Sequence, residues 1–256
     1  MIYLLSPAKT LDFESEIPAV RATKPRFLEH SSELVGIMKK KKPAELEELM
    51  GISPKLADLN AERFRTWKAD FTKEEARSAI FAFKGDVYQG LAVEEWEKDD
   101  FAAAQKSIRI LSGLYGILRP LDLMLPYRLE MGKKIENKRG PNLYRFWDNL
   151  LTESLNQDLK AKGDAVINLA SNEYFSAIQS KDIKAPVITP VFKDWKNGKY
   201  KIISFFAKKA RGMMASWAIQ NKVTTPEGLK KFKGGGYQFD SKLSDETTFV
   251  FTRKEG

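Results

Sequence analysis

The chain has 256 residues, 43% of them hydrophobic, which allows one large domain or two small ones with a substantial core. It contains no cysteine and one histidine, His30, so disulfides, thiol nucleophiles and cysteine-ligated zinc are excluded, and we interpret His30 as a capping or solvated side chain. The formal net charge is +9, and no run approaches the roughly 18 apolar residues that cross a membrane, which favours a polyanionic partner over a membrane.

The first half of the chain predicts one strand followed by helices. A short buried-type strand covers residues 2–5, and residues 31–84 have helical signals, including a capping box at Thr72 to Glu75 that opens a helix ending near Gly85. Asp99 and Asp100 can cap a further helix that runs through Leu111. The apolar run at the N-terminus is too short for a signal peptide, so we expect a cytoplasmic protein.

The second half predicts a helix over residues 142–161, a central strand over 165–170 and a helix beginning at Ser171 or Asn172. Asn197 and Gly198 predict a type I′ turn between strands at 187–195 and 200–206. A helix at 207–222 and short strands near 237–239 and 247–252 complete the chain. We expect an α/β protein, a single mixed α+β domain spanning 1–256 with a central mixed sheet and surrounding helices. The regular strand–helix alternation of a doubly wound sheet is not apparent.

The basic residues are concentrated in the second half of the chain. Residues 1–100 hold 16 lysines and arginines against 19 acidic residues, whereas residues 101–256 hold 27 against 15, a net of +12. Such asymmetry is typical of a surface for a polyanion, although a solvated lysine-rich face is the simpler alternative.

The segment from Ile108 to Pro120 resembles a helix–hairpin–helix, so we place such an element near residues 100–124. The glycines would let the backbone approach a phosphate, and the arginines would add charge-assisted hydrogen bonds. Two residues separate these glycines, where hLPGhG-type turns have one, and an ordinary helix end with glycine caps is the alternative. The candidate contacts here are Arg109, Gly113, Tyr115, Gly116 and Arg119.

Two more basic clusters are candidates for binding nucleic acid. Lys208, Lys209 and Arg211 stand near a predicted helix start, where cations oppose the helix dipole, which suggests a use for them on an anion or in ion pairs. Lys233 precedes three glycines whose amides can form an anion-binding nest, beside Tyr237, which could stack on a base. A mobile surface loop is an equally good interpretation of this last segment.

A set of polar residues follows the predicted strand ends, where sites often form in α/β proteins. If they converge, they would suit binding or acid–base chemistry on a phosphorylated or heterocyclic molecule. Tyr127 to Glu130 can equally form a structural ion pair. The set comprises Ser6, Lys9, Lys84, Asp86, Asp122, Tyr127, Arg128, Glu130, Ser171, Glu173 and Tyr174. No metal-ligand or cofactor motif is present, so neither a metal nor a cofactor is expected.

The chain resembles the peroxide stress protein YaaA family over nearly its whole length. The resemblance is carried by the words Leu5 to Asp12, Phe83 to Leu91, Leu111 to Asp122, Pro126 to Met131, Asn168 to Tyr174 and Lys208 to Gly212. It implies a cytoplasmic single-domain protein with a basic cleft, DNA binding through a helix–hairpin–helix-like element, and a role against hydrogen peroxide linked to lower free iron. It brings no catalytic reaction with it.

We therefore expect a DNA-binding protein of the peroxide response that contacts double-stranded or distorted DNA largely without sequence specificity. Without cysteine the chain cannot be a thiol peroxidase, and without a Glu-x-x-His word it lacks the pattern of an iron-storage site, so protection at the DNA is the better hypothesis. The alternative is an enzyme acting on a nucleotide-like or phosphorylated small molecule, with Lys9, Arg128, Glu173 and Tyr174 in its site.

Overall fold

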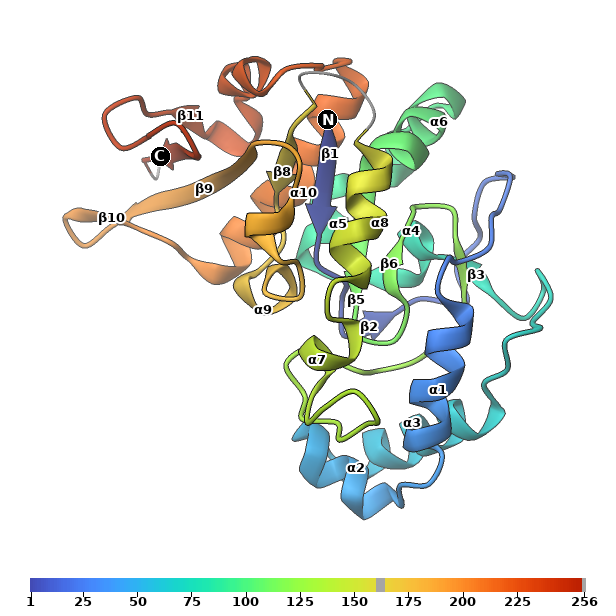
Figure 1. Cartoon of the computed structure of the whole chain (residues 1–256). Helices are drawn as coiled ribbons and strands as arrows, with labels where there is room; N and C mark the ends of the chain where they lie inside the picture. The colour runs from blue at the N-terminus through green and yellow to red at the C-terminus, as the bar shows by residue number, and fades with distance from the viewer. Residues whose placement is uncertain (160–163, 255–256) are drawn as a thin grey trace.

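The computed structural model describes residues 1–159 and 164–254, which build a central mixed sheet with helices on both faces (Figure 1). The strand order is β11-β12-β9-β8-β1-β5-β6, and β10 pairs with β9 as the eighth strand. The predicted fold class is confirmed. The bounds of the strands are β1 (Ile2–Leu5), β5 (Ile108–Ser112), β6 (Gly116–Leu118), β8 (Val166–Asn168), β9 (Val187–Lys196), β10 (Lys199–Lys201), β11 (Gln238–Phe239) and β12 (Thr248–Arg253).

The centre of the sheet is parallel and doubly wound. β1 pairs in parallel with β5 on one side and with β8 on the other, and β8 pairs in parallel with β9. The chain runs from β1 to β5, then crosses to β8 and β9, so the winding direction reverses between β1 and β8. In open α/β sheets ligands bind outside the carboxyl ends of the strands at such a reversal. The long connection between β1 and β5 hides this alternation in the sequence.

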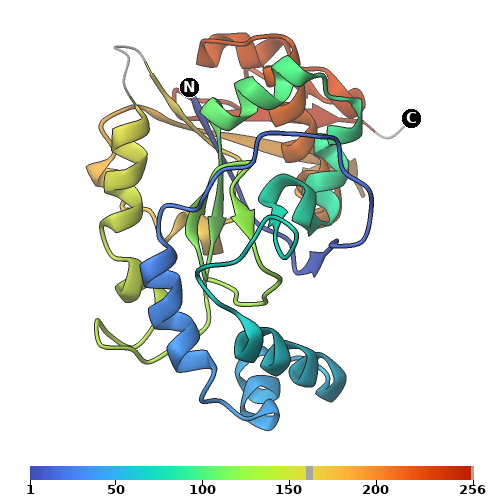
Figure 2. The same cartoon turned by 90° about the vertical axis from the view of Figure 1, so that its right-hand side faces the viewer.

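Helices cover both faces of the sheet. Figure 2 shows α8 and α1 on one side and α10 with α5 on the other. The α-helices are α1 (Leu28–Met38), α2 (Pro43–Met50), α3 (Pro54–Thr66), α4 (Ala79–Ala82), α5 (Asp86–Leu91), α6 (Lys98–Ser107), α7 (Leu143–Trp147), α8 (Leu150–Asp158), α9 (Asn172–Phe175) and α10 (Ser204–Gln220). The 3-10 turns are η1 (Val93–Glu95), η2 (Ser180–Asp182), η3 (Pro226–Lys231) and η4 (Gly234–Gly236), and the small sheets pair β2 (Thr10–Leu11) with β4 (Phe83–Lys84) and β3 (Arg77–Ser78) with β7 (Leu123–Met124).

The crossing of α5 and α10 is close enough to require glycine. A Cβ on Gly212 would lie 1.8 Å from the carbonyl oxygen of Val87, and one on Gly90 would lie 2.0 Å from that of Lys209. This contact fixes α5 against the sheet, so that the Tyr88 hydroxyl donates to the Ser6 carbonyl at 3.2 Å, just past the end of β1. The two glycines therefore help to position the residues that follow β1.

Three predicted helices differ from those in the structure. Thr72 to Glu75 forms a turn, because the buried residues after it pair as β3 with β7 and as β4 with β2. The helix predicted through Leu111 ends at Ser107, since residues 108–112 join the sheet as β5. The helix predicted over 142–161 is two helices, separated at Asp148 (φ 41°), and its last two residues lie outside the described part of the chain.

The predicted type I′ hairpin is confirmed. Asn197 and Gly198 have φ values of 52° and 77° between β9 and β10. β10 ends at Lys201 rather than at 206, because α10 already begins at Ser204.

Candidate functional site

The predicted helix–hairpin–helix at 108–120 is a buried β-hairpin. β5 and β6 pair antiparallel, Ser112 opposite Gly116, and the side chains of both strands are buried. A Cβ on Gly113 would lie 2.2 Å from the carbonyl oxygen of Leu129. Tyr115 is fully buried, with its hydroxyl accepting from Trp67 Nε1 at 2.9 Å. The sequence prediction of a phosphate-binding turn here was wrong, because the hydrophobic residues on both sides of the glycines serve the core of the sheet.

The two arginines of this segment belong to ion pairs. Arg109 is 3% exposed and donates from Nε to Asp158 at 2.7 Å. Arg119 donates to Asp122, which is fully buried and also accepts from the Thr23 hydroxyl at 2.6 Å. These guanidinium groups neutralise carboxylates of the fold, so we do not place them among the phosphate contacts.

The structure does contain an exposed helical hairpin, formed by α2 and α3 at the end of the molecule away from the chain termini (Figures 1 and 2). Gly51 ends α2 in the left-handed conformation (φ 63°, ψ 51°), and its N–H donates to the Glu47 carbonyl at 2.8 Å. Ile52 turns inward and is 9% exposed, whereas Gly51 and Ser53 are exposed. One residue separates Gly51 from Ser53, which is the spacing of an hLPGhG-type turn that the sequence analysis looked for elsewhere.

The N-terminus of α3 is open toward solvent. Pro54 occupies the first helical position, and within the described residues the Ser53 side chain accepts no capping hydrogen bond from the first amides. Such amides, with the helix dipole behind them, form a favourable position for a phosphate oxygen. Exposed Lys55 stands in this first turn, and Lys41, Lys133 and Lys134 share a cavity with residues of α2.

The candidate DNA contacts in the C-terminal part of the chain differ in their exposure to solvent. Lys208, Lys209 and Lys233 are exposed, as the sequence analysis expected of phosphate contacts. Tyr237 is 1% exposed and donates its hydroxyl to Asp194 at 2.8 Å, so the expectation that it stacks on a base was wrong. Arg211 is half-buried and belongs to a different site, described below.

A second polar site lies at the carboxyl ends of β1 and β8. The Ser6 hydroxyl accepts the backbone N–H of Ser171 at 2.9 Å and donates to the Ser171 hydroxyl at 3.3 Å. β1 and β8 are the neighbours between which the winding of the sheet reverses. The two serines therefore mark the position at which α/β sheets of this topology bind ligands.

Glu130 holds two cations in this strand-end site. Its Oε1 lies 3.1 Å from Arg128 Nη2 and 3.5 Å from Lys9 Nζ. Its Oε2 is buried and accepts no hydrogen bond from any residue that the structure describes. A buried oxygen without a donor costs about 1–3 kcal/mol, so Glu130 is the member of the site that gains most from an additional donor.

Glu173 and three tyrosines complete the strand-end site. Glu173 Oε1 accepts the backbone N–H of Gly132 at 2.9 Å, which holds the loop after Glu130 against α9. Burial raises the pKa of Tyr88, Tyr127 and Tyr174 well above the ordinary value, and for Tyr127 and Tyr174 the charge of Glu130 adds to it. All three hydroxyls stay protonated at neutral pH. They are suited to hydrogen bonding and not to acting as bases.

The position of Arg211 along α10 puts it near the carboxyl end of β1. The residues above and below it on its face of the helix are buried: Ala207, Met214, Ala215 and Ala218. Ala218 lines a cavity with Met1 and Tyr3 at the start of β1. Arg211 lies seven residues before Ala218, which is about 10 Å along a helix. Ser6 lies three residues after Tyr3, which is about 10 Å along a strand. Arg211 is therefore at about the same height as Ser6. The adjacent Gly212 contacts α5 next to Tyr88, whose hydroxyl reaches the Ser6 carbonyl.

Among the described residues, the guanidinium of Arg211 has no counter-charge. Within residues 1–159 and 164–254 it has neither a hydrogen bond nor an ion pair. Burial lowers the pKa of Arg211, as expected for a cation that is partly removed from water. An unpaired, half-buried cation is unusual in a folded protein, and an anion beside it would be strongly stabilising.

Two of the predicted strand-end residues, Asp122 and Lys84, have partners outside this group. Asp122 is buried and pairs with Arg119 and Thr23. Lys84 Nζ lies 3.1 Å from the carboxylate of Asp12. The pKa of Asp12 is below its ordinary value, because Ser15 donates hydrogen bonds to this carboxylate from its backbone and its side chain, and Lys84 donates another. Asp86 begins α5 and is half-buried. The members that the structure brings together are Ser6, Lys9, Tyr127, Arg128, Glu130, Ser171, Glu173 and Tyr174.

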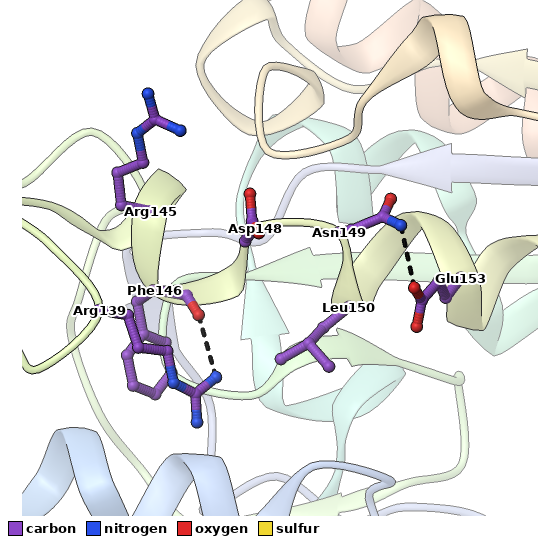
Figure 3. Close-up of a pocket in the computed structure, with 7 residues that line it drawn as sticks. All are labelled: Arg139, Arg145, Phe146, Asp148, Asn149, Leu150 and Glu153. Atoms are coloured by element: carbon purple, nitrogen blue, oxygen red, sulfur yellow. Dashed lines mark hydrogen bonds between the residues drawn. The ribbon is translucent and has the colours of Figure 1, made fainter.

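Another cavity, of about 450 Å³, lies beside α7 and α8 (Figure 3). Arg139 donates to the Phe146 carbonyl at 3.1 Å and stacks over its ring, and Asn149 donates to Glu153 at 2.9 Å. Figure 3 shows Arg145 pointing away from these residues. Because most of its polar groups are paired with each other, this cavity is a weaker candidate than the strand-end site.

The described residues provide neither a metal-ligand cluster nor a membrane-spanning helix. No group of three or more His, Asp or Glu side chains there could hold a metal ion. No helix there is long and apolar enough to cross a membrane.

The fold and its sites define a class of α/β protein with a doubly wound parallel centre, a projecting helical hairpin and a polar site at the strand ends. The chain belongs to the peroxide stress protein YaaA family, whose model matches residues 1–243, and the predicted family is thereby confirmed. It is similar to a "UPF0246 protein" of Hahella chejuensis, 54% identical over 254 residues and covering 99% of each chain. It is also similar to a "UPF0246 protein" of Aliivibrio fischeri, 53% identical over 256 residues and covering 100% of this chain and 99% of the relative.

Proposed function

We propose that this protein binds DNA, largely without sequence specificity, as its contribution to the peroxide stress response of its family, and that the α2–α3 hairpin is the main contact. The single observation that carries the proposal is the exposed Gly51-Ile52-Ser53 turn leading into the open N-terminus of α3. Hydrogen bonds from these amides to a DNA phosphate do not depend on the bases, so binding through them would show little sequence specificity.

The charges around the hairpin support this proposal. Lys55 is exposed in the first turn of α3, and Lys133 donates to the carbonyl of Met50 at 3.0 Å, at the end of α2. Lys41 and Lys134 lie beside the same helix. α2 also carries Glu45 and Glu48 in that cavity, so the phosphate is expected on the α3 side of the turn. The exposed Lys208, Lys209 and Lys233 are proposed as further contacts to the DNA backbone.

A salt titration tests the proposal. With a short fluorescent duplex, anisotropy should show affinity falling steeply with salt, with a log–log slope of about −0.9 for each of roughly 4–6 phosphates. Lys55→Gln should weaken binding uniformly across sequences and reduce that slope by about 1. Lys199→Gln, an exposed lysine at the tip of the β9–β10 hairpin, is the matched control and should leave both unchanged.

Gly51→Val tests the backbone contribution separately from charge. The left-handed conformation of Gly51 is strained for a β-branched residue, so the turn should change shape while the distant sheet stays folded. We expect weaker DNA binding with a nearly unchanged circular dichroism spectrum. A flat salt response, or equal losses in Lys55→Gln and Lys199→Gln, would refute the hairpin as the contact.

A further inference from the structure

The strand-end site has features that DNA contact at the helical hairpin does not use. We propose that it binds a small ligand that carries both an anionic group and an N–H donor, of the size and chemistry of a nucleoside monophosphate. Its position is the first support: Ser6 and Ser171 follow β1 and β8, where the winding of the parallel sheet reverses. Sheets of this topology bind nucleotides and similar ligands there.

The cations of the site specify the anionic part of the ligand. Arg211 is half-buried and pairs with none of the described residues, while Arg128 and Lys9 share one carboxylate oxygen between them. A phosphate group would give Arg211 its counter-charge and accept further hydrogen bonds from Arg128 and Lys9. Among the described residues the site thus holds three cations, Lys9, Arg128 and Arg211, against the two carboxylates of Glu130 and Glu173.

Glu130 specifies the donor part of the ligand. Its Oε2 is buried and receives no hydrogen bond within the described residues, although Oε1 is fully engaged with Arg128 and Lys9. An exocyclic amine or a ring N–H of a heterocycle would satisfy it. The protonated tyrosines Tyr127 and Tyr174 border this carboxylate and offer aromatic surface to such a ring.

The site fits a small molecule better than a nucleic acid duplex. Arg211 stands on a helix face whose other residues, among them Ala207 and Ala218, are buried, so only a compact group can reach its guanidinium. A duplex presents its phosphates on a broad convex surface and requires exposed cations. The helical hairpin provides such exposed groups, whereas in the strand-end site Lys9 is exposed but Arg128 and Arg211 are half-buried.

Calorimetric titration with three probes tests the proposal: 5′-AMP, adenosine and inorganic phosphate. AMP carries both chemical features, whereas adenosine lacks the anion and phosphate lacks the base, so AMP should bind more tightly than either. Arg211→Gln should weaken AMP binding by roughly tenfold or more, as expected for a lost charge-assisted contact, while adenosine binding changes little. The control is Lys196→Gln, an exposed lysine at the end of β9, which should bind AMP like the wild type.

Two further measurements keep the result interpretable. Arg211→Gln should unfold in urea at the same or a higher concentration than the wild type, because it removes a half-buried charge that has no partner among the described residues. Glu130→Gln should tighten the binding of phosphate, because Lys9 and Arg128 lose the negative charge of the Glu130 carboxylate that pairs with them. The ratio of AMP affinity to phosphate affinity should therefore decrease.

The proposal is overturned if the wild type shows no saturable AMP binding, or if Arg211→Gln binds AMP as the wild type does. It is also overturned if Arg211→Gln loses affinity for duplex DNA while AMP fails to bind, because the site would then be part of the DNA surface. An unchanged DNA affinity in Arg211→Gln together with lost AMP binding supports it. Failure of the hairpin variants to affect DNA binding leaves this result unaffected, so the two proposals can fail independently.

Discussion

Asp158 holds two arginines, and removing it tests whether Arg109 is structural. Arg109 Nε and Arg26 Nη1 donate to Asp158 Oδ2 at 2.7 and 2.8 Å, and Arg26 Nη2 donates to Oδ1 at 2.7 Å. The Arg109 side chain is only 4% exposed, so Asp158→Asn leaves a buried charge without its carboxylate. Breaking a buried pair in this way costs about 3–5 kcal/mol of unfolding free energy. Arg26 adds less, because solvent reaches it.

The same ion pair predicts a dependence on acid. Burial alone would raise the pKa of Asp158, but the hydrogen bonds from Arg26 and Arg109 outweigh it and lower that pKa to about 2. An aspartate in the unfolded chain titrates near about 3.9. Because the pKa is depressed in the folded state, the stabilisation is complete above about pH 4 and is lost as the pH falls toward 2. The difference corresponds to roughly 2–3 kcal/mol of unfolding free energy.

Urea unfolding of the wild type and of Asp158→Asn, from neutral pH into this acid range, measures both effects. The variant should be less stable at neutral pH and should lose less stability than the wild type on acidification. Glu246→Gln, at an exposed position, is the control and should follow the wild type. Equal acid sensitivity in Asp158→Asn and the wild type would refute the reasoning. A folded, stable Arg109→Gln with reduced DNA affinity would restore Arg109 as a phosphate contact.

Two glycine substitutions extend the test to packing. Gly113→Ala should lower the Tm strongly or prevent folding, because its Cβ would clash with the Leu129 carbonyl. The control is Gly36→Ala in α1, where nothing described lies within 4 Å of the new Cβ. This control should increase the unfolding free energy by up to about 1 kcal/mol. Gly212→Ala should push α5 away from α10, because the new Cβ would clash with the Val87 carbonyl. Scanning calorimetry should then show a lower Tm, and an unchanged Tm would disprove the clash.

The members of the strand-end site could be proposed from the sequence, but their convergence could not. Ser6 and Ser171 each follow a predicted strand, and they meet because those strands are parallel neighbours, which only the structure shows. Glu130 and Glu173 converge with them through the loop that Gly132 anchors. Asp122 could not be excluded in advance, since its partner Thr23 stands 99 residues away in the chain.

The turn between α2 and α3 is hard to predict from the sequence, because no cluster of basic residues marks it. The segment from Ile108 to Pro120 has two glycines flanked by arginines, but its isoleucines and leucines fill both faces of a buried strand, and tertiary contacts override the helical pattern. Gly51 lies in an acidic half of the chain, yet it has the left-handed conformation, the single-residue spacing to Ser53 and the following Pro54 that such a turn needs. Spacing was the more reliable signal.

Arg211 shows a different limit of sequence reasoning. Its neighbours Lys208 and Lys209 suggest one basic cluster, but successive residues of a helix point in different directions. Lys208 and Lys209 are exposed, whereas Arg211 turns toward the sheet among buried residues. The pattern of buried alanines at 207, 215 and 218 marks the sheet-facing side of this helix, and it could have separated Arg211 from the lysines.

The two proposed sites are joined by one short segment of chain. Glu130 belongs to the strand-end site, the Gly132 N–H donates to Glu173 there, and the next side chain, Lys133, donates to the Met50 carbonyl immediately before Gly51. A ligand that moves Glu130 would therefore shift the residue that braces the helical hairpin. By thermodynamic reciprocity, a ligand that alters DNA affinity through this segment must have its own affinity altered by DNA by the same factor. Because the Lys133 side chain links this loop to the end of α2, Lys133→Met should uncouple the sites while leaving each able to bind alone.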